Sequence, residues 1–185
     1  QQYGYRNHAR FTVGPGGNLG FVNRETRQFV GIDQCRLMHG QVNRQLAELQ
    51  GSCGETTQLS IRAGKETGEY LVQPSLLLAQ VPIATGQSSY ADSVGGRRFT
   101  VSSPSFVQVN IEQAAETVQV VRRCLNLTSS DVLLDAYTGV GTFAVMLAPH
   151  VKKVIAVEES SAAVADAREN SSGVDNIEFI LGKTE

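Results

Sequence analysis

Short apolar stretches alternate with helical patterns over the second part of this sequence. Strands that alternate with helices form βαβ units, in which the strands pair in parallel. The second part of the chain therefore predicts a parallel sheet. Its expected strands are residues 132–135, 153–157 and 177–181, and its expected helices are residues 108–127, 141–148 and 160–170.

The chain before residue 100 has a different pattern, with short strands that glycine turns separate. Residues 14–17 read Gly-Pro-Gly-Gly, and glycine supplies the positive φ that a tight reversal needs. We expect an α+β module with an antiparallel sheet. Its boundary with the second part falls at residues 102–105, which gives domains of residues 1–104 and 105–185. The expected strands are residues 9–13, 19–22, 28–33, 59–62, 70–73, 76–81 and 97–101, and one helix is expected at residues 39–50.

Composition limits the possible partners. The 185 residues are 41% hydrophobic and 18% charged, which is ordinary for a globular protein with a sizeable core. A net charge of −2 gives no global attraction to RNA or membranes, so RNA contact requires a local basic patch. No apolar run approaches the roughly 20 residues that cross a bilayer. Three scattered cysteines argue against a disulfide framework and for the reducing cytoplasm.

Two glycines directly follow the first expected parallel strand. Gly139 and Gly141 let the backbone turn into a helix and let a ligand approach without a Cβ in its way. Glu158 ends the second strand, where a carboxylate can accept hydrogen bonds from ribose hydroxyls. The pattern favours a cofactor site, and a purely structural turn is the alternative.

The cofactor class depends on Asp135. The spacing Gly139-x-Gly141-x-x-Ala144 also satisfies the dinucleotide fingerprint. In a dinucleotide site, however, an acid at the preceding strand end would oppose the pyrophosphate. S-adenosylmethionine (SAM) has no phosphate and carries a cationic ammonium and sulfonium. Asp135 therefore favours SAM.

Several segments together resemble the RNA (uracil-5-)-methyltransferase family, in order and over nearly the whole chain. The resemblance implies the first half of a Rossmann-like class I methyltransferase sheet after the α+β module. It also implies SAM-dependent methylation of C5 of uridine in rRNA or tRNA. The segments are Tyr5 to Arg10, Ile32 to Cys35, Phe106 to Asn110, Asp135 to Phe143, and Val157-Glu158.

The resemblance assigns roles to individual residues. Gln108 would grip the cofactor, Tyr137 and Thr142 would line its pocket, and Glu158 would hold the ribose. Lys183 stands near the adenine side but departs from the small or amide residue common there. Thr138 replaces a cysteine of many relatives, which we expect to matter little. The expected cofactor-binding set is Gln108, Asp135, Tyr137, Gly139, Gly141, Thr142 and Glu158.

In this family a cysteine thiolate adds to C6 of uracil and a carboxylate removes the C5 proton. Both groups lie in later segments, so we assign no catalytic residue here. The chain has no initiator Met and stops after a strand pattern, so we expect an inactive fragment of a longer enzyme. Cys124 is expected to be buried on the apolar side of its helix, and Cys53 to be a loop residue.

Cys35 matches a position at which some relatives hold a four-iron–four-sulfur cluster. A single cysteine cannot hold a cluster. A half-buried thiol is therefore favoured, with a cluster possible only in the full-length parent, and we assign no metal site.

Basic and aromatic residues gather in the first domain and are expected to face RNA, since arginines with interleaved aromatics suit phosphate contact and base stacking. A solvated sheet face is the alternative. The set is Arg6, Arg10, Arg24, Arg27, Arg36, His8, Tyr3, Tyr5, Phe11 and Phe21.

Two further readings stay open on the same fold: a non-catalytic RNA- or cofactor-binding module, and a methyltransferase with a small-molecule or protein substrate. The strand at residues 132–135 should be central in a whole enzyme, yet this chain supplies a neighbour on one side only. We expect edge-to-edge association, a swapped dimer, or disorder in residues 130–185.

Overall fold

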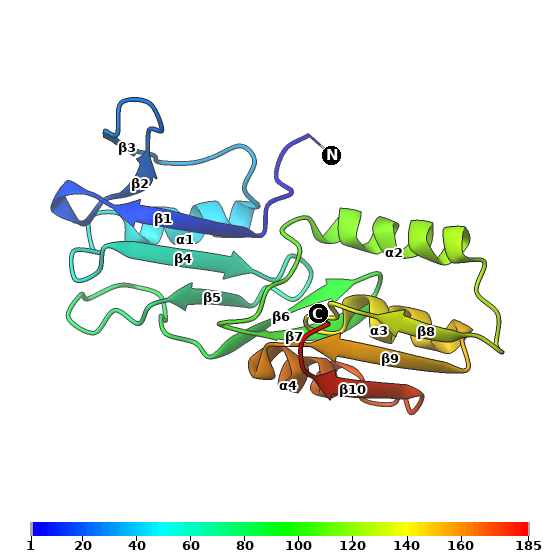
Figure 1. Ribbon diagram of the computed structural model, residues 1–185. Helices are drawn as coiled ribbons and strands as arrows, with labels where there is room; N and C mark the ends of the chain where they lie inside the picture. Colours follow the sequence, from blue (N-terminus) through cyan, green and yellow to red (C-terminus); the bar gives the residue numbers. More distant parts are fainter. Residues whose placement is uncertain (1, 185) are drawn as a thin grey trace. The chain divides into compact units, whose positions relative to one another are not determined.

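The computed structural model describes residues 2–184 and divides into two compact units, Gln1–Tyr90 and Ala91–Glu185 (Figure 1). We call them the first and the second unit and describe each by itself. The units divide earlier in the chain than residues 102–105, because the hairpin after residue 90 makes its contacts with the second unit. The assignment of an RNA-facing domain to residues 1–104 stays a prediction.

The first unit is an antiparallel sheet of order β3-β2-β1-β4-β5 with one helix, α1 (Gly40–Leu49). This confirms the predicted α+β module. A short 3-10 turn, η1 (Pro15–Gly17), joins the first two strands at the predicted glycine reversal. The strands are β1 (His8–Val13), β2 (Leu19–Val22), β3 (Phe29–Gly31), β4 (Gln58–Ala63) and β5 (Tyr70–Gln73).

One face of this sheet forms the core. Successive strand residues point to opposite faces, so Ala9 and Phe11 of β1 share a face with Leu59 and Ile61 of β4. Leu46 of α1 packs against these residues and completes the core. All five side chains are buried. On β1 and β4 the opposite face carries polar and basic residues, among them His8, Arg10 and Arg62.

The predicted strand at residues 76–81 is wrong. Its chain is irregular, and the side chains of Leu77 and Leu78 are 83% and 86% exposed. The backbone N–H groups of Leu77, Leu78 and Ala79 donate to the Glu55 carboxylate. Since these donors are used by a side chain, they do not pair with a strand.

The second unit contains a parallel sheet of order β10-β9-β8, which confirms the predicted fold class. A separate hairpin of β6 (Ser89–Val94) and β7 (Arg97–Ser102) precedes it, and β6 was not predicted. The sheet strands are β8 (Val132–Asp135), β9 (Lys153–Glu158) and β10 (Ile177–Leu181). The helices are α2 (Ile111–Leu125), α3 (Thr142–Leu147), the 3-10 turn η2 (Ala148–His150) and α4 (Ser161–Asn170).

Strand β9 is central, with Val154 and Ala156 buried, whereas β8 pairs with β9 alone among the described residues. Val132 and Leu134 of β8 are 57% and 62% exposed. The predicted one-sided pairing is therefore present. Association through β8 and disorder of residues 130–185 both stay predictions.

Helix α2 is covered along its first half only. Ile111, Ala114 and Val118 are buried, whereas Leu125 is 50% exposed. Cys124 is exposed, so its predicted burial is wrong: the helix end that carries it packs against little. None of the helices within residues 2–184 is both long enough and apolar enough to span a membrane.

Candidate functional site

Asp135 closes the loop that follows β8. Its Oδ2 accepts hydrogen bonds from Thr138 Oγ1 at 2.8 Å and from the backbone N–H of Ala144 at 3.1 Å. Ala144 lies in the first turn of α3, so the carboxylate caps that helix from a distance. Burial raises the pKa of Asp135, hydrogen bonds from Thr138, Ala144 and Tyr137 act against this, and the nearby charge of Glu158 adds a smaller increase. The Asp135 carboxylate therefore fixes the conformation of the loop between β8 and α3.

The two glycines of the loop have different tasks. Gly139 has φ of +55° and open space where a Cβ would stand. Gly141 has φ of +86°, and a Cβ there would lie 3.2 Å from the Cβ of Ala167 on α4. Gly141 therefore permits close packing of α3 on α4, while Gly139 leaves the loop open to a ligand.

Glu158 at the end of β9 holds the other side of the loop. Its Oε2 accepts from the backbone N–H of Gly139 at 3.0 Å, and its Oε1 accepts from that of Ser160 at 2.9 Å. Asp135 and Glu158 therefore lie at the carboxyl ends of neighbouring parallel strands, on either side of one glycine loop. This is the edge at which open α/β sheets bind ligands.

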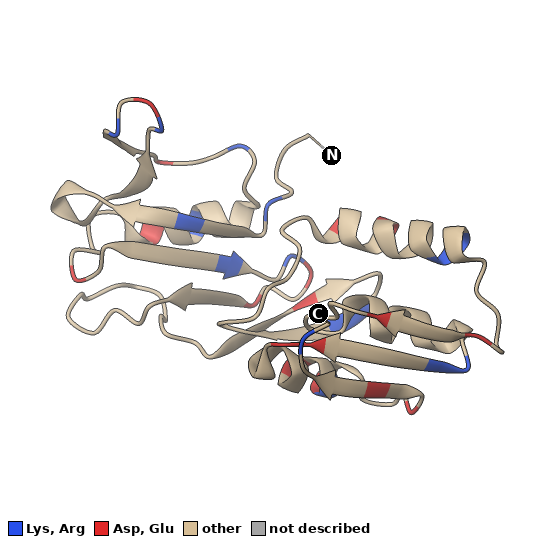
Figure 2. Ribbon diagram, in the orientation of Figure 1, with Lys and Arg blue, Asp and Glu red and all other residues tan. Residues whose placement is uncertain are grey.

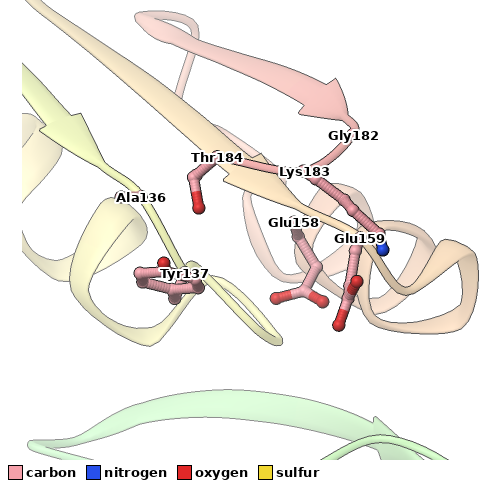
Figure 3. A pocket seen from close by; sticks show the side chains of 7 residues that line it. All are labelled: Ala136, Tyr137, Glu158, Glu159, Gly182, Lys183 and Thr184. Carbon is pink, nitrogen blue, oxygen red and sulfur yellow. The ribbon is translucent and has the colours of Figure 1, made fainter.

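Two hollows flank Tyr137, whose side chain is 77% exposed. In the first, of about 240 Å³, the Tyr137 ring lies across from the Glu158 carboxylate, with Glu159 beside the latter (Figure 3). Lys183 and Thr184 also line it. The second hollow, of about 280 Å³, lies between residues 106–117 and the glycine loop.

The structure brings most of the expected site residues to these hollows. Gln108, Tyr137, Gly139 and Thr142 line the second hollow, and Tyr137 and Glu158 line the first. Asp135 and Gly141 line neither and support the loop instead.

Thr138 makes two hydrogen bonds that were not predicted. It is buried, it donates to Asp135, and its backbone N–H donates to the carbonyl of Val157 at 3.0 Å. A hydroxyl residue three positions after an aspartate is a local signal for such a bond.

Asn170 and Asp166, on the buried face of α4, were also missed. Asn170 Nδ2 donates to the carbonyls of Val140 at 3.0 Å and Thr100 at 2.9 Å, and its Oδ1 accepts from the Thr100 N–H at 2.7 Å. Asp166 Oδ2 accepts from the N–H and the hydroxyl of Ser102. Helix α4 therefore joins the β6–β7 hairpin to the glycine loop. These pairs are far apart in the chain, so no local pattern reveals them.

The cysteines lie apart from one another. Cys53 is buried in a loop, and its Sγ lies 3.3 Å from the carbonyl of Leu49, to which it donates. Burial, with a smaller effect of Glu55, raises the pKa of Cys53 to about 11. Cys35 is half-buried, as favoured. Within the described part of the chain no three His, Cys, Asp or Glu side chains are placed to hold a metal.

The basic and aromatic set of the first unit is only partly on one surface. Phe11 belongs to the core, so its place in an RNA-facing set is wrong. Phe21 stacks on Phe11 from the edge of the core face, with ring centroids 5.5 Å apart. Arg24 and Arg27 lie in the β2–β3 turn, and Arg10 and His8 lie on the polar face of the sheet.

A family model described as tRNA (Uracil-5-)-methyltransferase matches residues 89–185. The chain belongs to this family. An uncharacterized RNA methyltransferase of Clostridium acetobutylicum is 34% identical over 75% of this chain and 28% of its own length. An uncharacterized RNA methyltransferase of Thermosynechococcus vestitus is 27% identical over 99% of this chain and 53% of its own length.

A solved structure has the same fold over nearly the whole chain. It is the Pyrococcus abyssi tRNA (uracil-54, C5)-methyltransferase in complex with S-adenosyl-L-homocysteine, with a TM-score of 0.77 and 20% identity. The match covers 99% of this chain and 56% of that one. The chain thus spans about half or less of the length of these proteins.

Proposed function

We propose that this chain is part of a SAM-dependent methyltransferase that methylates C5 of a uridine in tRNA or rRNA. Membership of the family supports an RNA substrate. The Pyrococcus abyssi enzyme acts on C5 of uracil-54 in tRNA and was solved with S-adenosyl-L-homocysteine, which is SAM without its methyl group. An RNA substrate and three free cysteines support a cytoplasmic location.

The pair of acids around the glycine loop carries the proposal. A dinucleotide site points free N–H groups of its loop and helix at a pyrophosphate. Here Glu158 takes the N–H of Gly139 and Asp135 takes that of Ala144. Two carboxylates thus stand where a pyrophosphate would need donors. A cationic ligand without phosphate suits this arrangement, because the carboxylates attract its charge.

The residues fit the two halves of SAM. Glu158 retains lone pairs on both oxygens after its two backbone bonds, so it can accept from ribose hydroxyls. Tyr137 forms a wall between the hollows, with Lys183 on the adenosine side. Gln108 and Thr142 line the other hollow, where the amino acid part would lie. When bound, SAM supplies an electrophilic methyl group.

We place the nucleophile and the base of the reaction outside this chain. Cys53 is buried with a raised pKa, which keeps its thiol protonated and unreactive. The contribution of this chain is to bind and orient the cofactor and to contact RNA.

Titration calorimetry with SAM and with NAD tests the cofactor. We expect SAM to bind preferentially and Glu158→Gln to weaken its binding about tenfold or more, because a glutamine amide has one oxygen acceptor and an NH2 donor in place of the second (tenfold is about 1.4 kcal/mol). Glu159→Gln is the matched control, since Glu159 lines the same hollow and holds no loop amide in the described structure. Preference for NAD, or equal SAM binding by wild type and Glu158→Gln, would contradict the proposal.

A further inference from the structure

In the first unit the ring of Phe29 packs against the backbone of three glycines, Gly14, Gly20 and Gly31, which we call the glycine floor. A Cβ added to Gly14 would come within 2.5 Å of this ring, and one added to Gly20 within 2.8 Å. At Gly31 the corresponding distance is 3.6 Å. Any larger residue at Gly14 or Gly20 would lift the ring. The ring is half-buried, so its inner face is held by backbone while part of it stays accessible.

This ring is on the polar face of the sheet. In the antiparallel register Thr12 is opposite Gly20, and Gly20 is opposite Gly31. Residues opposite one another point to the same face, and alternate residues of a strand do too. Arg10, Thr12 and the glycine floor therefore share a face, which is the opposite of the core face that carries Phe11.

The same face carries clustered positive charge. Three guanidinium groups, those of Arg62, Arg6 and Arg10, act electrostatically on His8, and with burial they lower its pKa to about 4. His8 Nε2 lies 3.0 Å from Ser60 Oγ on the neighbouring strand. Among residues 2–184, the side chains of Arg6 and Arg10 have neither a hydrogen bond nor an ion pair.

The strands of the sheet add no negative charge to this face. The five strands contain no Asp or Glu, and Figure 2 shows blue segments and no red on β1 and β4. Arg6 and Arg10 are therefore available to a bound anion, which would offset their charge. The part of this face that carries Arg10 and Phe29 is complementary to a polyanion.

We propose that this face binds a single-stranded segment of RNA, with Phe29 stacking on a base and Arg6 and Arg10 contacting phosphates. The proposal rests on the RNA substrate proposed above and names the surface that holds it. A flat ring fixed on backbone offers a stacking platform at little entropic cost, and arginines beside it bind the sugar–phosphate chain. An acidic peptide would use the arginines but gains nothing from the ring.

The test uses short single-stranded RNA that carries one 2-aminopurine, whose fluorescence falls when it stacks on an aromatic ring. We expect wild type to quench the probe, and Phe29→Leu to lose the quenching and to bind about tenfold more weakly. Phe29→Tyr should restore both. Phe21→Leu is the matched control, because Phe21 is 39% exposed on the core side of the same hairpin and should leave binding unchanged.

Arginine variants test the phosphate contacts. Arg10→Gln should weaken binding and lower the slope of log affinity against log salt by about one. Equal quenching and affinity for wild type and Phe29→Leu, with unchanged thermal unfolding, would overturn the stacking role. Full displacement of the RNA by a polyglutamate of equal charge, without quenching in wild type, would mark a general anion surface and overturn the inference. Absence of RNA binding would also overturn it, whereas the cofactor proposal depends on SAM binding measured separately.

Discussion

The first unit buries one face of its sheet under a helix, whereas the second leaves the apolar strand β8 at an edge. In the first unit Phe11, Leu46 and Ile61 are almost completely buried. In the second unit Leu134 of β8 is 62% exposed, and the glycine loop is held by the polar side chains of Asp135, Glu158 and Asn170.

The difference separates stability from site geometry. When a packed apolar side chain is truncated, the free energy of unfolding falls by an amount that grows with the volume removed. A loop held by single hydrogen bonds depends on individual side chains, because a buried donor or acceptor left alone is costly. We therefore expect core variants to destabilise the first unit without altering the proposed cofactor site, and polar variants to alter that site with a smaller loss of stability.

The largest expected effect is on the core of the first unit. Leu46 is fully buried, so Leu46→Ala should lower the free energy of unfolding of this unit by about 2–5 kcal/mol. Urea denaturation measures the loss. Leu78→Ala is the control, since Leu78 is 86% exposed and should cost little. A parallel loss of SAM affinity by the folded Leu46→Ala protein would break the comparison.

Asn170→Ala should have the next largest effect and lower the free energy of unfolding by about 1–3 kcal/mol. The variant leaves the backbone carbonyls of Val140 and Thr100 without these partners. Amide hydrogen exchange should rise at Gly141, whose N–H donates to the Thr138 carbonyl within the loop.

Asn176→Ala is a closely matched control for that variant. Asn176 Nδ2 also donates to two carbonyls, those of Ala148 at 2.9 Å and Val151 at 3.0 Å, and none of its bonds reaches the loop. It should lower stability similarly without faster exchange at Gly141. Identical exchange in both variants would show that α4 does not hold the loop.

A smaller effect is expected from pH. Burial and three arginines lower the pKa of His8 in the folded protein from 6.5 to about 4. The unfolded chain therefore binds the proton first as pH falls, so the stabilising effect is complete above pH 6.5 and is lost progressively toward pH 4. Between pH 7 and pH 4.5, the free energy of unfolding should fall by about 1 kcal/mol more in wild type than in His8→Gln, after allowance for the partial exposure of His8. Equal losses in urea denaturation would contradict this assignment.

The smallest change in folding stability is expected at the exposed edge. Leu134→Lys should change the free energy of unfolding by no more than about 0.5 kcal/mol, because the side chain is mostly in solvent. It should nevertheless reduce association at high concentration, since a lysine on an edge strand opposes pairing with another strand. Light scattering that shows wild type and variant equally monomeric would remove the predicted association.

The strand–glycine–helix junction could be predicted because its geometry depends on neighbouring residues. Gly139 and Gly141 adopt the positive φ that the sequence implied, and Glu158 ends the adjacent strand. Family resemblance added Gln108 and Thr142, which line one hollow.

Features that depend on distant contacts were not predictable in the same way. Strand β6 was missed because its buried residues include Asp92 and Ser93, which give no apolar pattern. The opposite error arose at Leu77 and Leu78, which are apolar and exposed because Glu55 holds their backbone. The contacts of Phe29 bring its ring onto Gly14, which follows β1, and onto Gly20 of β2, and only the folded arrangement of the hairpins shows this.

Glu158 also limits how readily this site can change its ligand over evolutionary time. Its two oxygens hold the backbone amides of Gly139 and Ser160. A lineage that exchanged Glu158 for a side chain suited to another nucleotide would release both segments in the same step. Another side chain must therefore take over these two hydrogen bonds before Glu158 is replaced, so we expect such a transition to require more than one mutation.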